Sequence, residues 1–159
     1  MPVGPRVVFV RFTTSASPKL TPWITHAERV VGSTPSTSIA ETTIGDAVVW
    51  QLVSANNRQL ARGAAVHPTF QEAHAHASAV VGSSDRLRLV LASEPGRGVY
   101  GWHATLDDQP AMTCSRWYLT ERDRRYSIEV ALRSIAVAVL HTGSRLADPA
   151  LMAGEHANG

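Results

Sequence analysis

The sequence predicts an α+β fold in which two tandem units, each of three strands and one helix, form a mainly antiparallel sheet with the helices packed on one face. The first observation is an internal repeat, because residues 50–60 and 102–112 share a tryptophan, a polar turn and an apolar residue at the same spacing. The second is the alternation of apolar residues around each tryptophan, which is typical of strands. The third is that apolar residues at helical intervals follow each predicted hairpin.

The strands of the first unit, expected over about residues 6–82, follow from these patterns. A leading strand is expected at residues 6–12. Residues 48–53 alternate in a way that gives a strand one strongly apolar face. Residues 55–58, Ala-Asn-Asn-Arg, supply a tight turn, because asparagine tolerates the left-handed backbone conformation. The return strand is expected over about residues 59–64.

The helix of the first unit is expected to begin after Thr69. Glu72 follows three positions later, which is the spacing of a capping box, and apolar residues then recur at helical intervals until Gly82 ends the helix. The Ser/Thr/Pro-rich stretch of residues 13–47 interrupts this unit. It is expected to be an insertion or a mobile loop, which could contain a short helix at residues 25–31.

The second unit, expected over residues 86–143, repeats the order of the first. Its leading strand is expected at residues 86–92 and its second strand at residues 99–105. The acidic turn of residues 107–110 then leads to a return strand over about residues 111–119.

A polar segment over residues 120–125 is expected to precede the second helix, so that this unit carries a short insertion. Gly143 is expected to end that helix. Apolar residues extend around more than one side of it, which favours either central packing in the monomer or a dimer interface. Residues 1–143 would then form a single domain. Residues 144–159, which lack periodicity, would form a flexible tail.

The composition is that of a globular protein of the cytoplasm. Of its 159 residues, 44% are hydrophobic and 18% are charged, and the net charge of +2 does not by itself imply nucleic acid. The single cysteine, Cys114, excludes an intramolecular disulfide and suits a reducing compartment. The apolar run at residues 7–10 is too short for a signal peptide, and the one at residues 130–140 is too short to span a membrane. No membrane association is therefore expected.

Trp50 and the segment of residues 52–61 resemble the signature of the YegP-like family of small bacterial and archaeal proteins. In that family an aromatic residue and a leucine precede an Ala-Asn-Gly turn, an aliphatic-alanine pair and a helix, and tandem copies are common. Here Asn57 replaces the turn glycine, and the second unit keeps only Trp102, the acidic turn and Met112. The resemblance implies the two-unit α+β fold. It implies no activity, because the function of the family is unknown.

Seven histidines raise the question of a metal site. His74 and His76 lie two positions apart on a predicted helix and so point in different directions, whereas paired helical ligands lie four apart. His67, Cys114 or Glu72 could join one of them, but the spacing contains no ligand motif. Cys114 is expected to be a small buried side chain rather than a nucleophile. No catalytic residue, metal ligand or cofactor is therefore predicted, and a small metal-dependent enzyme is the least favoured alternative.

Arginines beside aromatic residues form the strongest local feature. The four arginines are Arg116, Arg122, Arg124 and Arg125. Such a combination can hold phosphates and stack on bases, although Glu121 and Asp123 in the same segment are typical of a solvated charged loop. We expect a non-enzymatic binding or accessory module that acts through protein contacts at a sheet edge, as a homodimer or with another protein. Nucleic-acid binding by the four arginines is the alternative.

Overall fold

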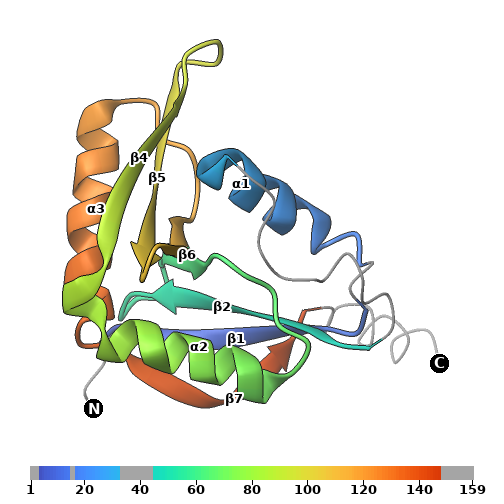
Figure 1. Cartoon of the computed structure of the whole chain (residues 1–159). Coiled ribbons are helices and arrows are strands. Elements are labelled where there is room, and N and C mark those ends of the chain that lie inside the picture. Colours follow the sequence, from blue (N-terminus) through green and yellow to red (C-terminus); the bar gives the residue numbers. More distant parts are fainter. Residues whose placement is uncertain (1–3, 15–16, 33–44, 148–159) are drawn as a thin grey trace.

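The structure, a computed structural model, describes residues 4–14, 17–32 and 45–147. Within these residues the protein is an α+β protein with a mainly antiparallel, seven-stranded sheet in the order β4-β5-β6-β3-β2-β1-β7 (Figure 1). The strands are β1 Arg6–Phe12, β2 Ala47–Val53, β3 Gln59–Gly63, β4 Arg88–Glu94, β5 Val99–Leu106, β6 Gln109–Cys114 and β7 Val139–Leu146. The helices are α1 Thr21–Val31, α2 Phe70–Gly82 and α3 Glu121–Ile135, and a 3₁₀ turn lies at Ser84–Arg86.

The two central hairpins form at the predicted turns. Between β2 and β3, Asn57 has a φ of 68°, and between β5 and β6, Asp107 and Asp108 have φ values of 52° and 67°. Asparagine and aspartate are the residue types, apart from glycine, that tolerate this left-handed region. The return strands of the two hairpins pair with each other in antiparallel fashion, with Arg62 on β3 opposite Thr113 on β6. This pairing joins the two hairpins into one sheet.

Helices α2 and α3 begin at threonine caps. The Oγ1 atom of Thr69 accepts a hydrogen bond from the backbone N–H of Glu72 at 3.1 Å, and that of Thr120 accepts one from Asp123 at 3.0 Å. Each cap satisfies one of the free amides of a helix start, so the predicted cap at Thr69 is confirmed. The prediction that a polar segment over residues 120–125 precedes the second helix is wrong. Helix α3 begins at Glu121, because the cap starts it within that segment.

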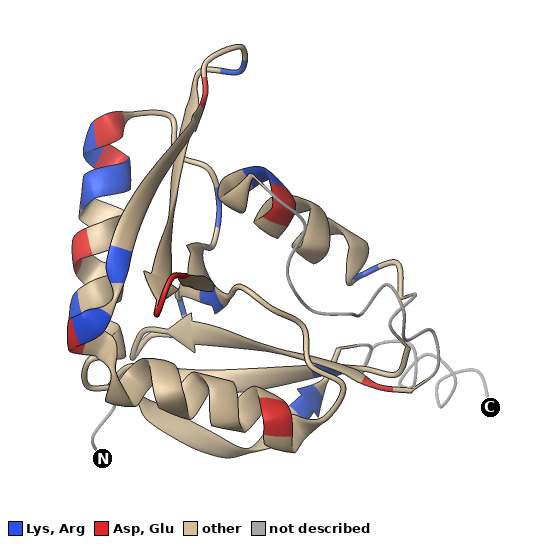
Figure 2. Ribbon diagram, in the orientation of Figure 1, with Lys and Arg blue, Asp and Glu red and all other residues tan. Residues whose placement is uncertain are grey.

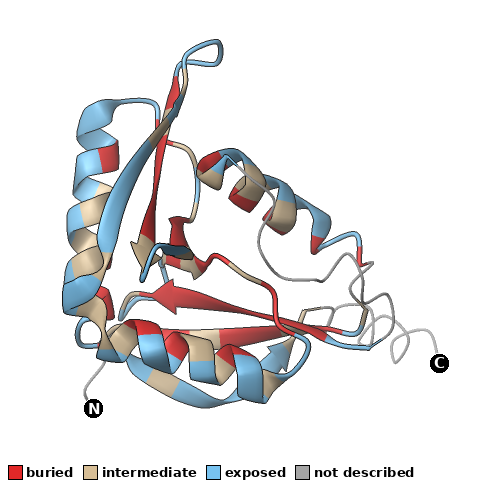
Figure 3. Cartoon of the chain, in the orientation of Figure 1, coloured by how far each residue is buried: buried red, intermediate tan, exposed pale blue. Residues whose placement is uncertain are grey.

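Helices α2 and α3 cover one face of the sheet and α1 covers part of the other. The indole Nε1 of Trp50 donates to Nδ1 of His76 on α2 at 3.0 Å, and that of Trp102 donates to Oγ of Ser127 on α3 at 3.0 Å. Both tryptophans are fully buried in the main core. The strands that carry them, β2 and β5, are buried along most of their length (Figure 3). Helix α3 is buried along one side only, so the expectation of burial on several sides is wrong.

Helix α1 occupies the stretch that was expected to be an insertion or a mobile loop. It begins earlier than the predicted residues 25–31, since Pro22 in its first turn suits a helix start, and it ends at Gly32, which has a φ of 81°. Trp23, Ala27 and Val30 recur at helical spacing and are buried against the sheet. Residues 15–16 and 33–44 of the predicted insertion lie outside the described residues.

The chain after α3 departs from the prediction. Helix α3 ends at Ile135 and not at Gly143, and β7 pairs in parallel with the outer edge of β1. The β-branched Val137 and Val139 disfavour a longer helix, and a strand satisfies the backbone groups that β1 would otherwise leave unpaired. Strand β7 therefore runs across the boundary predicted at residue 143. Residues 148–159 of the predicted tail lie outside the described residues.

Candidate functional site

The four arginines of the nucleic-acid hypothesis do not share one environment. Arg124 is buried, and its Nη1 donates to the carbonyl of Ala92 at 3.1 Å. Its Nη2 lies 3.4 Å from a carboxylate oxygen of Glu121, and its guanidinium lies 5.2 Å from the ring centroid of Tyr100. The other three are exposed, namely Arg116, Arg122 and Arg125. Acidic and basic residues alternate at the start of α3 (Figure 2). Nucleic-acid binding by this set stays a prediction, and Arg124 serves to pack α3 against β4 and β5.

Arg116 lines a surface hollow of about 690 Å³ that also includes Arg58, Tyr126 and Asp123. Arg58 and Arg116 therefore line the same hollow. Asp123 brings the opposite charge into the same hollow. Arg62 does not line this hollow, and its guanidinium lies 4.4 Å from the ring centroid of Trp23 on α1.

His67 and His76 lie together, with ring centroids 5.1 Å apart. Burial, and to a smaller extent the charge of His76, lower the pKa of His67 to about 4; burial also lowers the pKa of His76. Both rings are therefore neutral at neutral pH. Among the residues that the structure describes, no group of three or more His, Cys, Asp or Glu side chains could hold a metal ion. The histidine pair belongs to the interior beneath α2.

Cys114 is fully buried, which confirms the prediction for this side chain. Its Sγ lies 3.9 Å from Nε2 of His26 and 3.4 Å from the backbone nitrogen of Trp102. Burial raises the pKa of the thiol to about 11. The reactive thiolate is therefore scarce at neutral pH, and nothing in this environment activates Cys114 as a nucleophile.

A row of polar side chains crosses the sheet on the face that α1 partly covers. The register places its members directly opposite one another on neighbouring strands, in the order His103, Thr113, Arg62 and Gln51. Three of them are only 6%, 1% and 7% exposed, namely His103, Thr113 and Gln51. The Nε of Arg62 and the Nδ1 of His103 are buried without a hydrogen-bond partner. Unsatisfied buried polar atoms are costly, so this polar row is not an ordinary core layer.

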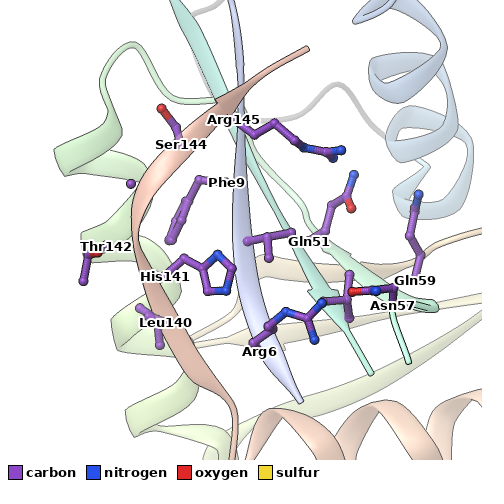
Figure 4. A pocket seen from close by; sticks show the side chains of 13 residues that line it. Arg6, Phe9, Gln51, Asn57, Gln59, Leu140, His141, Thr142, Ser144 and Arg145 are labelled. Atoms are coloured by element: carbon purple, nitrogen blue, oxygen red, sulfur yellow. The ribbon is translucent and has the colours of Figure 1, made fainter. Parts of the chain in front are cut away.

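The polar row leads to a cavity of about 870 Å³, here called the basic pocket, that lies beside β7 (Figure 4). Its polar lining comes from four neighbouring strands and the β2–β3 turn: Arg6, Gln51, Asn57, Gln59, His141 and Arg145. The sheet is irregular here, because the register between β1 and β7 shifts between Val7 and Phe9. Such a bulge bends the strand locally and helps to form a concave surface. No Asp or Glu lines the pocket within the described part of the chain.

Strand β4 forms the opposite edge of the sheet. It pairs with β5 from Arg88 to Glu94 without any irregularity. Its centre is apolar and open, since Leu89, Val90 and Leu91 are 41%, 40% and 55% exposed. Because successive residues of a strand point to opposite faces, both faces of β4 present apolar surface. This strand and the basic pocket are the two candidate sites for binding.

The sequence-based interpretation missed the basic pocket, because residues 139–146 were assigned to the end of a helix and a tail. Without β7 there was no wall opposite Arg6 and Gln51. One signal was available, since Gln51 interrupts an otherwise apolar strand and Arg62 alternates with Ala61 and Gly63. That alternation marks a polar side of the sheet.

No protein-family model matches the chain, and no curated protein matches it. A solved structure shows similarity over most of the chain. It is the solution NMR structure of yegP from E. coli, a protein of unknown function; the match covers 91% of this chain and 99% of that one, with a TM-score of 0.49 and 10% identity. No helix in the described residues is long and apolar enough to cross a membrane.

Proposed function

We propose that this protein is a non-enzymatic interaction module of the cytoplasm that forms a homodimer by pairing strand β4 with β4 of a second copy. The observation that carries the proposal is that β4 is a regular edge strand with an exposed apolar centre. An edge of this kind offers a row of backbone hydrogen-bonding groups to another strand. In a twofold dimer the same surface serves both copies.

The backbone geometry indicates which groups of β4 face outward. Tyr100 on β5 exchanges both of its backbone hydrogen bonds with Tyr118, on the side away from β4. Its neighbour across the strand pair, Ser93, therefore occupies a non-hydrogen-bonded position, and its N–H and C=O point to the open edge. Leu91 and Leu89 follow at intervals of two residues, so their backbone N–H and C=O groups also point to the open edge. No backbone hydrogen bond from another described element reaches these residues.

The sequence of β4 is complementary to itself in the antiparallel direction. If the twofold axis passes through Leu91, the outward N–H and C=O of Leu91 pair with those of Leu91 in the second copy. Arg88 then lies opposite Glu94 at both ends of the paired strands. Opposite charges across a strand pair stabilise it, and neighbouring apolar side chains of the two copies cover one another. Charge complementarity thus favours a second copy of this chain as the partner.

The other sheet edge, β7, is less suited to the same role. Its pairing with β1 shifts in register between Val7 and Phe9, and the strand contains Gly143. Bulges and irregular edges are a common protection against strand addition. Strand β4 has no such feature in its seven residues.

Two tandem copies of one unit best account for the fold of the monomer, and this relation is part of the proposal. The antiparallel bridge of Val48 with His67 has a counterpart in that of Tyr100 with Tyr118. The indole bonds from Trp50 to α2 and from Trp102 to α3 match in the same way. On this reading β4 is the leading strand of the second unit. Its counterpart β1 is covered on its outer edge by β7, whereas β4 is not.

The dimer can be tested by sedimentation velocity of the wild-type chain and of Leu91→Lys over a range of protein concentrations. Lysine at the centre of an edge strand opposes strand addition, and two lysines would meet at the twofold axis. The wild-type protein is expected to dimerise, and Leu91→Lys is expected to weaken the dimer more than 100-fold, because both partners carry the change.

Val137→Lys is the matched control, since Val137 is another exposed apolar residue, 66% exposed, and lies outside β4. This variant should dimerise like the wild-type protein. The β4 interface would be refuted if the wild-type chain stayed monomeric at every protein concentration tested. It would also be refuted if Val137→Lys broke the dimer and Leu91→Lys did not.

A further inference from the structure

We propose that the basic pocket binds a phosphorylated small molecule, with Arg145 and Arg6 holding its phosphate groups. This site is separate from the β4 interface, because the pocket lies among β7, β1, β2 and β3 at the other end of the strand order. The proposal does not rest on the dimer.

The charge of the pocket favours an anion. Arg145 and Arg6 line it, and no carboxylate from the described residues offsets them. Arg145 is exposed and forms no ion pair with any described residue. Uncompensated cations in a concave surface concentrate anions there.

Both arginines line the same pocket and have donors that no described residue uses. Nη1 of Arg6 donates to the carbonyl of Ser54 at 3.1 Å, which holds the side chain in place and uses one of its five N–H donors. Arg145 uses none of its donors on the described residues. Figure 4 shows both side chains at the rim of one cavity, from β7 above and β1 below. A planar guanidinium matches two oxygens of a phosphate, so this pair suits a group with several phosphate oxygens.

Neutral polar groups complete the lining. Gln51 is only 7% exposed, and Gln59 and Asn57 lie beside it around the same space (Figure 4). Side-chain amides both donate and accept hydrogen bonds, so they can recognise the polar edge of a base or a sugar. The volume of about 870 Å³ fits a ligand of nucleotide size rather than a single inorganic ion.

The adjoining polar row strengthens this assignment. Arg62, directly opposite Gln51 on the neighbouring strand, has a buried Nε without a partner, and burial lowers the pKa of its guanidinium. A partly buried guanidinium that forms no ion pair with a described residue adds to the positive potential beside Gln51. The positive charge therefore extends from the rim of the pocket to its inner side.

Isothermal titration calorimetry at low ionic strength tests the site with three probes: ADP, inorganic pyrophosphate and succinate. ADP and pyrophosphate are expected to bind, and ADP more tightly because the amides contact its nucleoside. Succinate carries two carboxylates and should bind at least about tenfold more weakly than pyrophosphate. Tighter binding of succinate would overturn the assignment to phosphate, and absence of heat with all three probes would overturn the site.

The variant Arg145→Gln should weaken both phosphate probes by about tenfold or more, since it removes a charge-assisted contact. It should remain folded, because Arg145 is exposed and forms no described ion pair. Arg133→Gln is the matched control, since Arg133 is an exposed arginine on α3 and does not line the pocket. Equal affinities for Arg145→Gln and the wild-type protein would place the anion elsewhere and refute the proposal.

Discussion

Reversing the charges at the ends of β4 is the sharpest test of the proposed dimer. In the register centred on Leu91, each dimer contains two contacts between Arg88 of one copy and Glu94 of the other. The single change Arg88→Glu turns both attractions into repulsions. A cross-strand charge pair contributes about 0.2–1 kcal/mol, so each contact changes by about 1 kcal/mol and the dimer by about 2 kcal/mol. At about 1.4 kcal/mol per tenfold, the dissociation constant should rise by about 30-fold.

The double variant Arg88→Glu with Glu94→Arg should restore most of the affinity, because it exchanges the two charges and keeps the pairs. Sedimentation velocity at low ionic strength measures each dissociation constant, and raising the salt should reduce the differences, since exposed charges are screened. Glu94 also forms an ion pair with Arg97 at 2.6 Å, so recovery is expected to be incomplete. If the double variant dimerises no better than Arg88→Glu alone, the antiparallel register is wrong.

Two further predictions concern the interior. A Cβ at Gly63 would lie 2.5 Å from Nε1 of Trp50, so Gly63→Ala should lower the free energy of unfolding, measured by urea denaturation, by about 1–3 kcal/mol. Gly82→Ala is the control, because a Cβ there meets nothing within 4 Å, and it should leave the free energy of unfolding equal or slightly higher. The folded-state pKa of His67 is lowered from 6.5 to about 4, so the unfolded chain binds more protons between these values. Stability should therefore fall as the pH drops from 6.5 to 4, and His67→Tyr should show a shallower fall; an unchanged slope would contradict this assignment.

Much of the sheet could be predicted because its strands are specified locally. The segment of residues 48–64 contains an alternating strand, a turn whose Asn57 adopts a positive φ, and a return strand, and all of these signals lie within a few residues of one another. The same holds for the cap at Thr69, which depends on a contact three residues away. Local signals of this kind are readable without knowledge of the tertiary structure.

The elements that the sequence did not reveal depend on distant partners. Strand β7 forms because its residues pair with β1, more than a hundred positions earlier in the chain, and a short valine-rich segment after a helix has no distinctive period. Helix α1 is fixed by the contacts of Trp23 with Arg62 and by burial of Val30, which come from the other side of the sheet. The basic pocket requires β7, so it could not be predicted before that strand was placed.

The order of the strands makes the two proposed sites compatible. A dimer joined through β4 would form one continuous sheet in which the β7 edge of each copy lies farthest from the twofold axis. The basic pocket is lined by β7 and its near neighbours, so pairing of β4 would leave both pockets open. Two strands, β5 and β6, separate β4 from β3, which is the strand of the pocket wall nearest to β4. Strands β6 and β3 carry Thr113 and Arg62, and the polar row that these residues form with His103 and Gln51 crosses from one half of the sheet to the other, as the main apolar core does.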